Sequence, residues 1–193
     1  VPSVSDELFL KIAARIIEPT IKGMLEEGVP FKGVLYAGLM LTDQGPKVLE
    51  YNARFGDPEA QAIIPRLKND LVDVILTAID CNLNGMKLNW DKRSAVCVVM
   101  SSGGYPAVYE TGKEVFGLEL AANDPDTIVF HAGTKKTGEK ILTSGGRVLG
   151  VTSLGANIED AIKKVYKSVE KITFEKCFFR RDIGFKALKR IKV

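Results

Sequence analysis

The sequence predicts an α+β fold, in which an antiparallel sheet flanked by helices is followed by a small β-rich domain with a closing helix. Apolar residues recur at helical spacing near both ends of the chain, and a hairpin pattern follows the first of these segments. Short β-like runs separated by glycine-rich turns fill much of the second half. We therefore predict two domains, residues 1–88 and 89–193.

The first predicted element is one amphipathic helix from Asp6 to about Glu27, preceded by Ser3, which with Asp6 resembles a capping box. A proline inside a helix removes a backbone donor and clashes with the preceding turn, so we expect a kink at Pro19. The apolar residues at helical spacing are Leu8, Ile12, Ile16, Ile21, Met24 and Leu25.

A β-hairpin is predicted next, with strands 33–42 and 47–52 and a turn at 43–46. The first strand is apolar on both faces, so we expect the hairpin to lie inside a covered sheet.

Two helices should follow. Pro58 occupies the first position of the predicted helix 58–67, and Asp57 is its expected N-cap. The second helix begins at Asn69 or Asp70, and the Asn84-Gly85 pair is expected to end it.

The second half has four β-like runs, which predict a small mixed sheet: 94–101, 113–120, 127–132 and 147–152. A helix from Ile158 to about Ile172 follows, with apolar residues along one side and lysines elsewhere. These lysines are interpreted as a solvated face.

Composition narrows the functional classes. The 27 basic residues exceed the 24 acidic residues by only three, so neither a nucleic acid nor a membrane is expected as a partner, and no apolar run is long enough for a membrane span. The three cysteines are far apart and suit reduced thiols in a cytoplasmic protein. The chain begins without a methionine, and we expect it to be a fragment.

The segment Glu50 to Glu59 carries the most chemistry. Side chains alternate along a strand, so Glu50, Asn52 and Arg54 should share one face, roughly 6.6 Å from one to the next. Carboxylate and amide oxygens suit Mg²⁺, which takes one or two protein ligands together with phosphates. A guanidinium suits phosphate oxygens, and Asp57 and Glu59 add two carboxylates beyond it.

Structural interpretations stay open at each of these positions. The three polar residues could form a solvated strand face with cross-strand ion pairs, and Asp57 could serve only as a helix cap. The negative charge of Glu59 in the first helical turn would be stabilised by the helix dipole, whether or not Glu59 binds a substrate. His131 lies in an apolar run and is interpreted as a structural hydrogen-bonding residue, and the Gly103-Gly104 and Gly145-Gly146 pairs as tight turns.

Several segments in order resemble the glycinamide ribonucleotide synthetase (phosphoribosylamine-glycine ligase) family of the ATP-grasp superfamily. They are GVLYAGLMLT and GPKVLEYNARFGDPE in the hairpin region, then VFHAGT, SGGRVLGVT and FFRRDIG. The resemblance covers nearly the whole chain, with the C-terminal part of an ATP-grasp domain followed by that family's C-terminal domain.

The resemblance implies an enzyme that uses ATP to join glycine to 5-phosphoribosylamine through a glycyl phosphate, in purine biosynthesis. It implies that Glu50 and Asn52 bind Mg²⁺ or Mn²⁺ and that Arg54 holds phosphate oxygens. Asp57 and Glu59 would help to orient glycine or the second substrate.

Two departures from the family pattern qualify this assignment. Many ATP-grasp enzymes have a further acidic ligand on the preceding strand, where this chain has Tyr36-Ala37-Gly38. The N-terminal domain and the ATP-clamping lobe are also absent, so we expect the 193-residue chain alone to be inactive and the missing parts to lie in the same or another chain. The alternatives are another ATP-grasp carboxylate-amine ligase, or a noncatalytic module that docks on a separate nucleotide-binding subunit.

Overall fold

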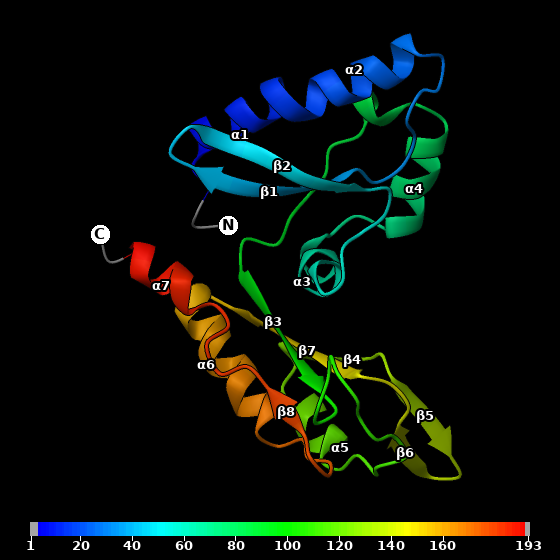
Figure 1. Cartoon of the computed structure of the whole chain (residues 1–193), viewed down its shortest axis with the longest axis vertical. Helices are drawn as coiled ribbons and strands as arrows, with labels where there is room; N and C mark the ends of the chain where they lie inside the picture. The colour runs from blue at the N-terminus through cyan, green and yellow to red at the C-terminus, as the bar shows by residue number, and fades with distance from the viewer. Residues whose placement is uncertain (1–3, 192–193) are drawn as a thin grey trace. The chain divides into compact units, whose positions relative to one another are not determined.

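The computed structural model describes residues 4–191 and divides into two compact units (Figure 1). Unit 1 comprises the residues up to Asp57 together with Leu67–Trp90, and unit 2 comprises Pro58–Arg66 and the residues from Asp91 onward. Each unit contains helices and antiparallel strands, which confirms the α+β class. The last boundary between the units lies after Trp90, two residues beyond the predicted division at residue 88. Residues 58–66 also belong to unit 2, although the predicted division places them in the first domain.

The first helical segment of unit 1 is continuous but not uniform. It consists of α1 (Asp6–Ile12), a π-helical turn (Ala13–Ile17) and α2 (Glu18–Glu26). Pro19 cannot donate to the carbonyl of Arg15, and the wider π-helical turn lies just before it, where the missing donor interrupts the regular helix. Ser5 caps α1 by accepting the Leu8 N–H at 3.2 Å, whereas Ser3 of the predicted capping box lies outside the described residues.

The predicted hairpin is confirmed as β1 (Tyr36–Thr42) and β2 (Gly45–Asn52). Thr20 of α2 and Tyr51 of β2 share a hydrogen bond of 2.8 Å between their hydroxyls. The expectation that the hairpin lies inside a covered sheet is wrong for the described residues. The sheet has only two strands there, and Met40 and Leu49 are 51% and 65% exposed.

Helix α4 (Leu71–Ile79) begins as predicted, because the Asp70 side chain accepts the Val72 N–H at 2.8 Å. The predicted end at Asn84-Gly85 is wrong. Cys81 adopts a left-handed conformation (φ 57°), and the N–H groups of Cys81 and Asn82 return to the last carbonyls of the helix. A short 3₁₀ turn, Leu83–Gly85, follows.

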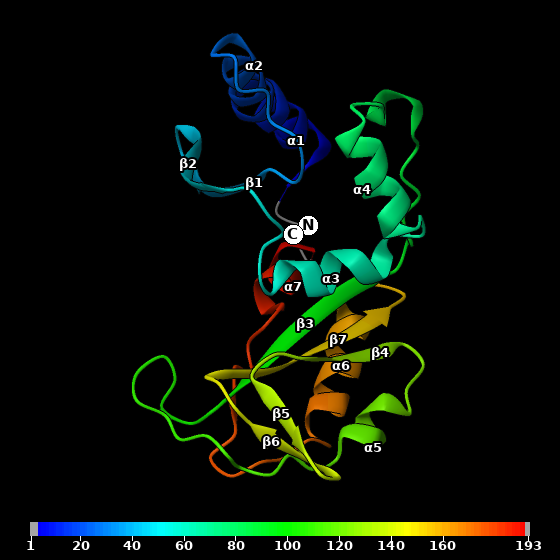
Figure 2. The same ribbon diagram turned by 90° about the vertical axis from the view of Figure 1, so that its right-hand side faces the viewer.

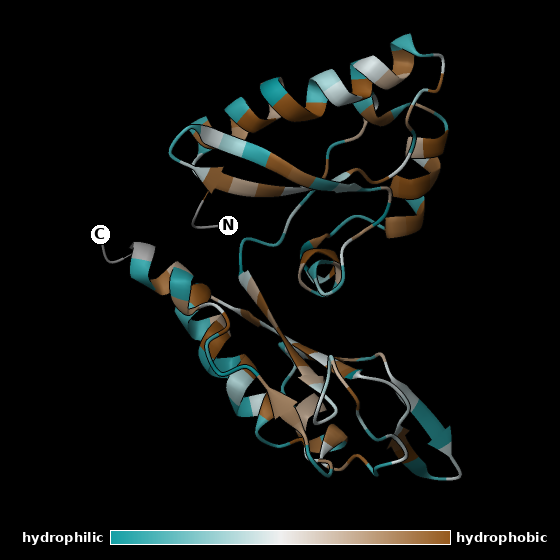
Figure 3. Ribbon diagram, in the orientation of Figure 1, coloured by the Kyte–Doolittle hydropathy of each residue, from teal (hydrophilic) through white to brown (hydrophobic). Residues whose placement is uncertain are grey.

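Unit 1 has little core among its described residues. Ile16 is its only buried apolar side chain in that range, whereas α4 exposes a row of apolar residues that Figure 3 shows in brown. The row comprises Val72, Ile75, Leu76 and Ile79.

Unit 2 is built on one antiparallel sheet in the order β4-β7-β3-β8. The predicted mixed sheet is wrong, since every pair in it is antiparallel, and the run 113–120 contributes only two isolated bridges before a helix begins. The strands are β3 (Ser94–Ser101), β4 (Thr127–His131), β7 (Arg147–Gly155) and β8 (Phe178–Phe179), and the other elements are α5 (Leu118–Ala122), the hairpin β5 (Thr134–Thr137) and β6 (Lys140–Thr143), α6 (Ile158–Val169) and α7 (Phe185–Ile191).

The core of unit 2 lies between this sheet and α6. Val98 of β3 and Val151 of β7 are paired across the sheet and fully buried, and Val165 of α6 is equally buried in the same cluster. Two serine hydroxyls, Ser153 and Ser168, lie within hydrogen-bond distance of the Thr127 hydroxyl at 2.7 and 3.2 Å. These three buried hydroxyls are therefore paired with one another.

The opposite face of the sheet carries α3 (Glu59–Ile63), as Figure 2 shows. The Thr152 hydroxyl, which is almost completely buried, donates to the Gln61 carbonyl at 2.9 Å and fixes α3 on β7. A 3₁₀ turn, Ile64–Arg66, follows α3. Helix α3 begins one residue later than predicted, at Glu59, and Pro58 occupies the cap position without a side-chain bond.

An ion network joins the start of β4 to α6 and to the segment before β3. Asp126 accepts from Arg93 at 2.6 Å and from Lys164 at 2.7 Å, and Arg93 also pairs with Asp91. The hydrogen bond from Lys164 is the main cause that lowers the pKa of the Asp126 carboxyl, and Arg93 acts in the same direction.

We expect Asp126→Asn to reduce the stability of unit 2 near neutral pH, and this difference to shrink in acid. Because the folded pKa of Asp126 is depressed, its stabilisation is present above the unfolded value of about 3.9 and is lost as the pH falls through the folded value. Thermal unfolding of both proteins between pH 2 and 7 measures this gap. A gap of equal size at both ends of the range would show that the carboxylate charge is not responsible.

Candidate metal and phosphate site

Glu50 and Asn52 lie near the end of β2 and face each other along the strand. The Asn52 amide donates through Nδ2 to Glu50 Oε1 at 3.1 Å. The Glu50 side chain is exposed, and Asn52 is half-buried. The alternation of the strand thus places a carboxylate and an amide oxygen side by side, as the spacing predicts.

Gly38 lies directly across the hairpin from Glu50. The register pairs Tyr36 with Asn52 and Gly38 with Glu50, and it then shifts so that Leu39 pairs with Val48. A β-bulge of this kind gives one strand an extra residue and changes the direction of the side chains beside it. The bulge therefore lies immediately next to the Glu50 carboxylate.

Arg54 lies beyond the strand, which ends at Asn52. The alternation that predicts a shared face for Glu50, Asn52 and Arg54 therefore extends only to the first two. The Arg54 guanidinium donates through Nη1 to the Phe55 carbonyl at 2.9 Å. A guanidinium has five N–H donors, so this bond leaves capacity for phosphate oxygens.

Asp57 and Glu59 belong to different units. Asp57 is the last residue of the first segment of unit 1, whereas Glu59 is the first residue of α3 in unit 2. A hydrogen bond joins Glu50 directly to Asn52. Asp57 and Glu59, in contrast, lie on either side of the point where the chain passes from unit 1 to unit 2.

The donor set suits a hard divalent cation that also binds phosphate. Glu50 offers carboxylate oxygens, and Asn52 offers its amide oxygen while its nitrogen is bonded to Glu50. Within residues 4–191, no group of three or more histidine, cysteine and acidic side chains could hold a metal by itself. A cation at this place would therefore depend on substrate phosphates and water for its remaining ligands.

The other candidate residues have structural roles in unit 2. His131 has the expected structural contact, with its Nδ1 2.9 Å from the Thr134 hydroxyl. The Gly145-Gly146 turn is filled by the protein itself, because a side chain at Gly146 would overlap the Tyr105 ring. Such a packed turn leaves no cradle for a phosphate.

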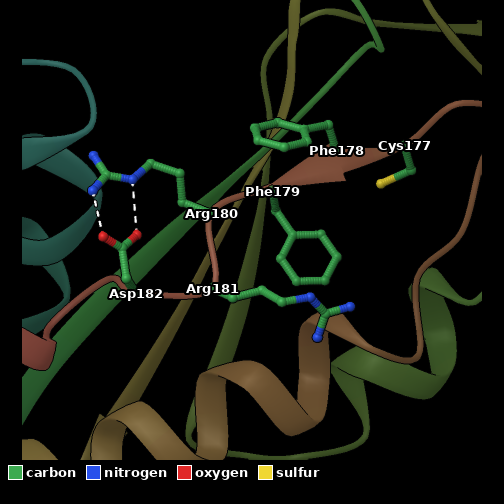
Figure 4. A pocket seen from close by; sticks show the side chains of 6 residues that line it. All are labelled: Cys177, Phe178, Phe179, Arg180, Arg181 and Asp182. Carbon is green, nitrogen blue, oxygen red and sulfur yellow. Dashed lines mark hydrogen bonds and ion pairs between the residues drawn. The ribbon is translucent and has the colours of Figure 1, made fainter.

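A cavity of about 500 Å³, lined by residues 177–182, was not predicted from the sequence (Figure 4). Arg180 pairs with Asp182 through two hydrogen bonds of 2.9 and 2.7 Å, and Arg181 lies over the Phe179 ring at 5.0 Å from its centre. Burial raises the pKa of the Cys177 thiol to about 11, so this cysteine stays protonated at neutral pH. The consecutive Arg-Arg-Asp residues are the only sequence signal of this place.

Within the described range, no helix combines the length and the apolar character needed to cross a membrane.

Two family models match the chain. The model for phosphoribosylglycinamide synthetase, ATP-grasp (A) domain, matches residues 1–60, which include Glu50, Asn52 and Arg54. The model for phosphoribosylglycinamide synthetase, C domain, matches residues 95–186. The two matches fall largely on unit 1 and unit 2, respectively.

Similar proteins carry names of the same family. Phosphoribosylamine–glycine ligase of Caldanaerobacter subterraneus subsp. tengcongensis is 46% identical over 95% of this chain, and that of Escherichia coli O157:H7 is 48% identical over 98%. The crystal structure of phosphoribosylamine–glycine ligase from Thermotoga maritima is 35% identical and superposes on 90% of the chain with a TM-score of 0.76.

A more distant structure shares the fold. N5-carboxyaminoimidazole ribonucleotide synthetase from Thermotoga maritima is 17% identical, covers 89% of this chain and has a TM-score of 0.55. The chain spans less than half the length of the ligases that it matches: 43% of the Caldanaerobacter protein, 44% of the Escherichia coli protein and 42% of the Thermotoga ligase structure.

Proposed function

Because the chain belongs to the phosphoribosylglycinamide synthetase family, we propose that it is the metal- and phosphate-binding part of an ATP-dependent ligase that joins glycine to 5-phosphoribosylamine. The observation that carries the proposal is the Glu50–Asn52 pair at the end of β2, inside the segment matched by the ATP-grasp model. Identity of 46–48% to ligases over almost the whole chain supports the choice of this reaction.

Glu50 and Asn52 would hold Mg²⁺ or Mn²⁺ in this proposal. The cation supplies neutralisation of negative charge on the transferred phosphoryl group. Glu50 contributes the only negative charge of this pair, and the hydrogen bond from Asn52 keeps the carboxylate oxygen in place. Arg54 would hold phosphate oxygens through the N–H groups that do not bond Phe55.

The proposed reaction has two steps. A carboxylate oxygen of glycine attacks the γ-phosphorus of ATP, the bond to the β-phosphate oxygen breaks, and glycyl phosphate and ADP result. The amine nitrogen of phosphoribosylamine then attacks the acyl carbon, phosphate leaves, and a proton is lost from nitrogen. Neither step needs a nucleophile from the protein, so positioning and charge are what its residues must provide.

Asp57 and Glu59 extend the proposal toward the amine substrates. Carboxylates suit the ammonium group of glycine or the hydroxyls of the ribose, and these two flank the passage from unit 1 to unit 2. The nucleotide base and the rest of the substrate would be bound by further ATP-grasp and N-terminal parts of the same or another chain. The free cysteines fit a reducing compartment, and we include a cytoplasmic location in the proposal.

A product assay tests this function. A hybrid enzyme is made in which the 193 residues replace the matching segment of the Escherichia coli relative. The hybrid is then incubated with ATP, Mg²⁺, glycine and phosphoribosylamine. We expect glycinamide ribonucleotide, ADP and phosphate, detected by mass spectrometry, and no product from the 193-residue chain alone. ATP turnover with a different amine, and none with phosphoribosylamine, would instead indicate another ATP-grasp carboxylate-amine ligase.

A further inference from the structure

We propose that Gly38 is a positioning residue that keeps the Glu50 carboxylate beside Asn52, so that both oxygens can reach one divalent cation. This inference rests on the proposed metal role of Glu50 and Asn52, and it adds a residue on the neighbouring strand that touches no substrate.

The glycine is explained by side-chain space and not by backbone conformation. Gly38 is absent from the glycines with positive φ, so an L-residue could adopt its backbone geometry without strain. In a strand, a glycine weakens pairing and often marks the close approach of another group. The group that approaches here is the Glu50 side chain.

The geometry opposite Gly38 leaves too little room for a methyl group. An ideal Cβ at Gly38 would lie 3.0 Å from Glu50 Cγ and 3.7 Å from Oε1, and Oε1 is the atom that accepts from Asn52. A carbon–carbon distance of 3.0 Å is shorter than the optimal van der Waals separation of roughly 3.5 Å or more. One of the two side chains must therefore move.

Glu50 is the side chain that would yield. It is exposed and flexible, whereas the backbone of both strands is held by the hairpin register. Glu50 must give by a few tenths of an ångström, and the proposal is that this shift carries Oε1 away from Asn52 while the hairpin persists. Groups that orient metal ligands typically contribute about 10- to 100-fold to metal affinity.

Manganese provides a probe that does not depend on catalysis. Bound Mn²⁺ broadens the NMR signals of nearby amides, so titration of the ¹⁵N-labelled 193-residue chain with MnCl₂ and an equal amount of inorganic triphosphate, which supplies the phosphate ligands, measures binding near Tyr51 and Asn52. We expect Gly38→Ala to require at least about tenfold more Mn²⁺ for the same broadening, with the cross-strand contact of Tyr36 and Asn52 retained. Gly23→Ala, in α2 with nothing within 4 Å of its new methyl group, is the matched control and should titrate like the wild type.

Two further variants separate the outcomes. If Glu50→Gln titrates like the wild type, or if the wild type shows no local broadening, the proposed metal site fails and the role of Gly38 fails with it. If Glu50→Gln loses the broadening but Gly38→Ala keeps it, only the role of Gly38 is overturned.

Loss of the hairpin signals in Gly38→Ala is resolved by the double variant Gly38→Ala/Glu50→Ala. Recovery of the Tyr36–Asn52 contact in the double variant supports the close contact with Glu50 as the cause. A hairpin that stays unpaired without the Glu50 side chain overturns the inference.

Discussion

Glu50→Gln should lower ligase turnover by about a thousandfold in the hybrid enzyme while leaving its fold intact. The substitution keeps the size of the side chain and removes the one negative charge of the Glu50–Asn52 pair. Loss of the cation withdraws several kcal/mol of charge stabilisation from phosphoryl transfer, and about 4 kcal/mol corresponds to a thousandfold in rate. Steady-state release of ADP and glycinamide ribonucleotide measures the effect.

The matched control for this charge is Glu139→Gln, in the exposed turn between β5 and β6. It removes the same charge from unit 2 far along the chain from β2, and we expect turnover close to that of the unsubstituted hybrid. Near-normal activity of Glu50→Gln, with a circular dichroism spectrum unchanged, would show that Glu50 is not a metal ligand.

Gly117→Ala should destabilise unit 2 by about 3 kcal/mol or more. Gly117 has φ 82°, a left-handed conformation that costs an alanine roughly 1–2 kcal/mol. In addition, its new methyl group would overlap the Lys171 carbonyl, and this stretch of backbone is held in place because Phe116 and Thr173 bond to each other at 2.9 and 3.1 Å. Backbone atoms held in this way cannot move aside as an exposed side chain can.

Gly112→Ala separates the two causes. Gly112 has nearly the same conformation, with φ 80°, but nothing lies within 4 Å of the place that its new methyl group would take, so only the conformational cost of about 1–2 kcal/mol should remain. Hydrogen exchange of the β3 and β7 amides reports the stability of unit 2 by itself. Equal losses in the two variants would show that the overlap with Lys171 is relieved without cost.

Elements with a strong apolar period were predictable from the sequence, and elements that depend on partners were not. Helix α6 follows from its period of 3.6, and the β1–β2 hairpin follows from two apolar runs on either side of a turn. The hairpin of β5 and β6 was missed because its strands are short and rich in lysine and threonine. The run 113–120 looks extended in sequence, but left-handed Gly117 ends it and begins α5.

The candidate site divides in the same way. Alternation along one strand is a local property, so the closeness of Glu50 and Asn52 could be predicted, although their metal role remains a prediction. Whether Arg54 shares the same face could not be predicted, because this depends on where the strand ends. Gly38 was missed as a partner of Glu50, since a sequence does not reveal cross-strand register around a bulge.

The attachment of α3 to the sheet of unit 2 has a consequence for dissection of the protein. The chain changes unit at 57/58, 66/67 and 90/91, so no single cleavage separates the units with all their parts. A recombinant piece that starts at Asp91 would leave the Thr152 hydroxyl without the Gln61 carbonyl and uncover one face of β7. A C-terminal piece that keeps the packing on this face of β7 must therefore carry the short segment 58–66 as well.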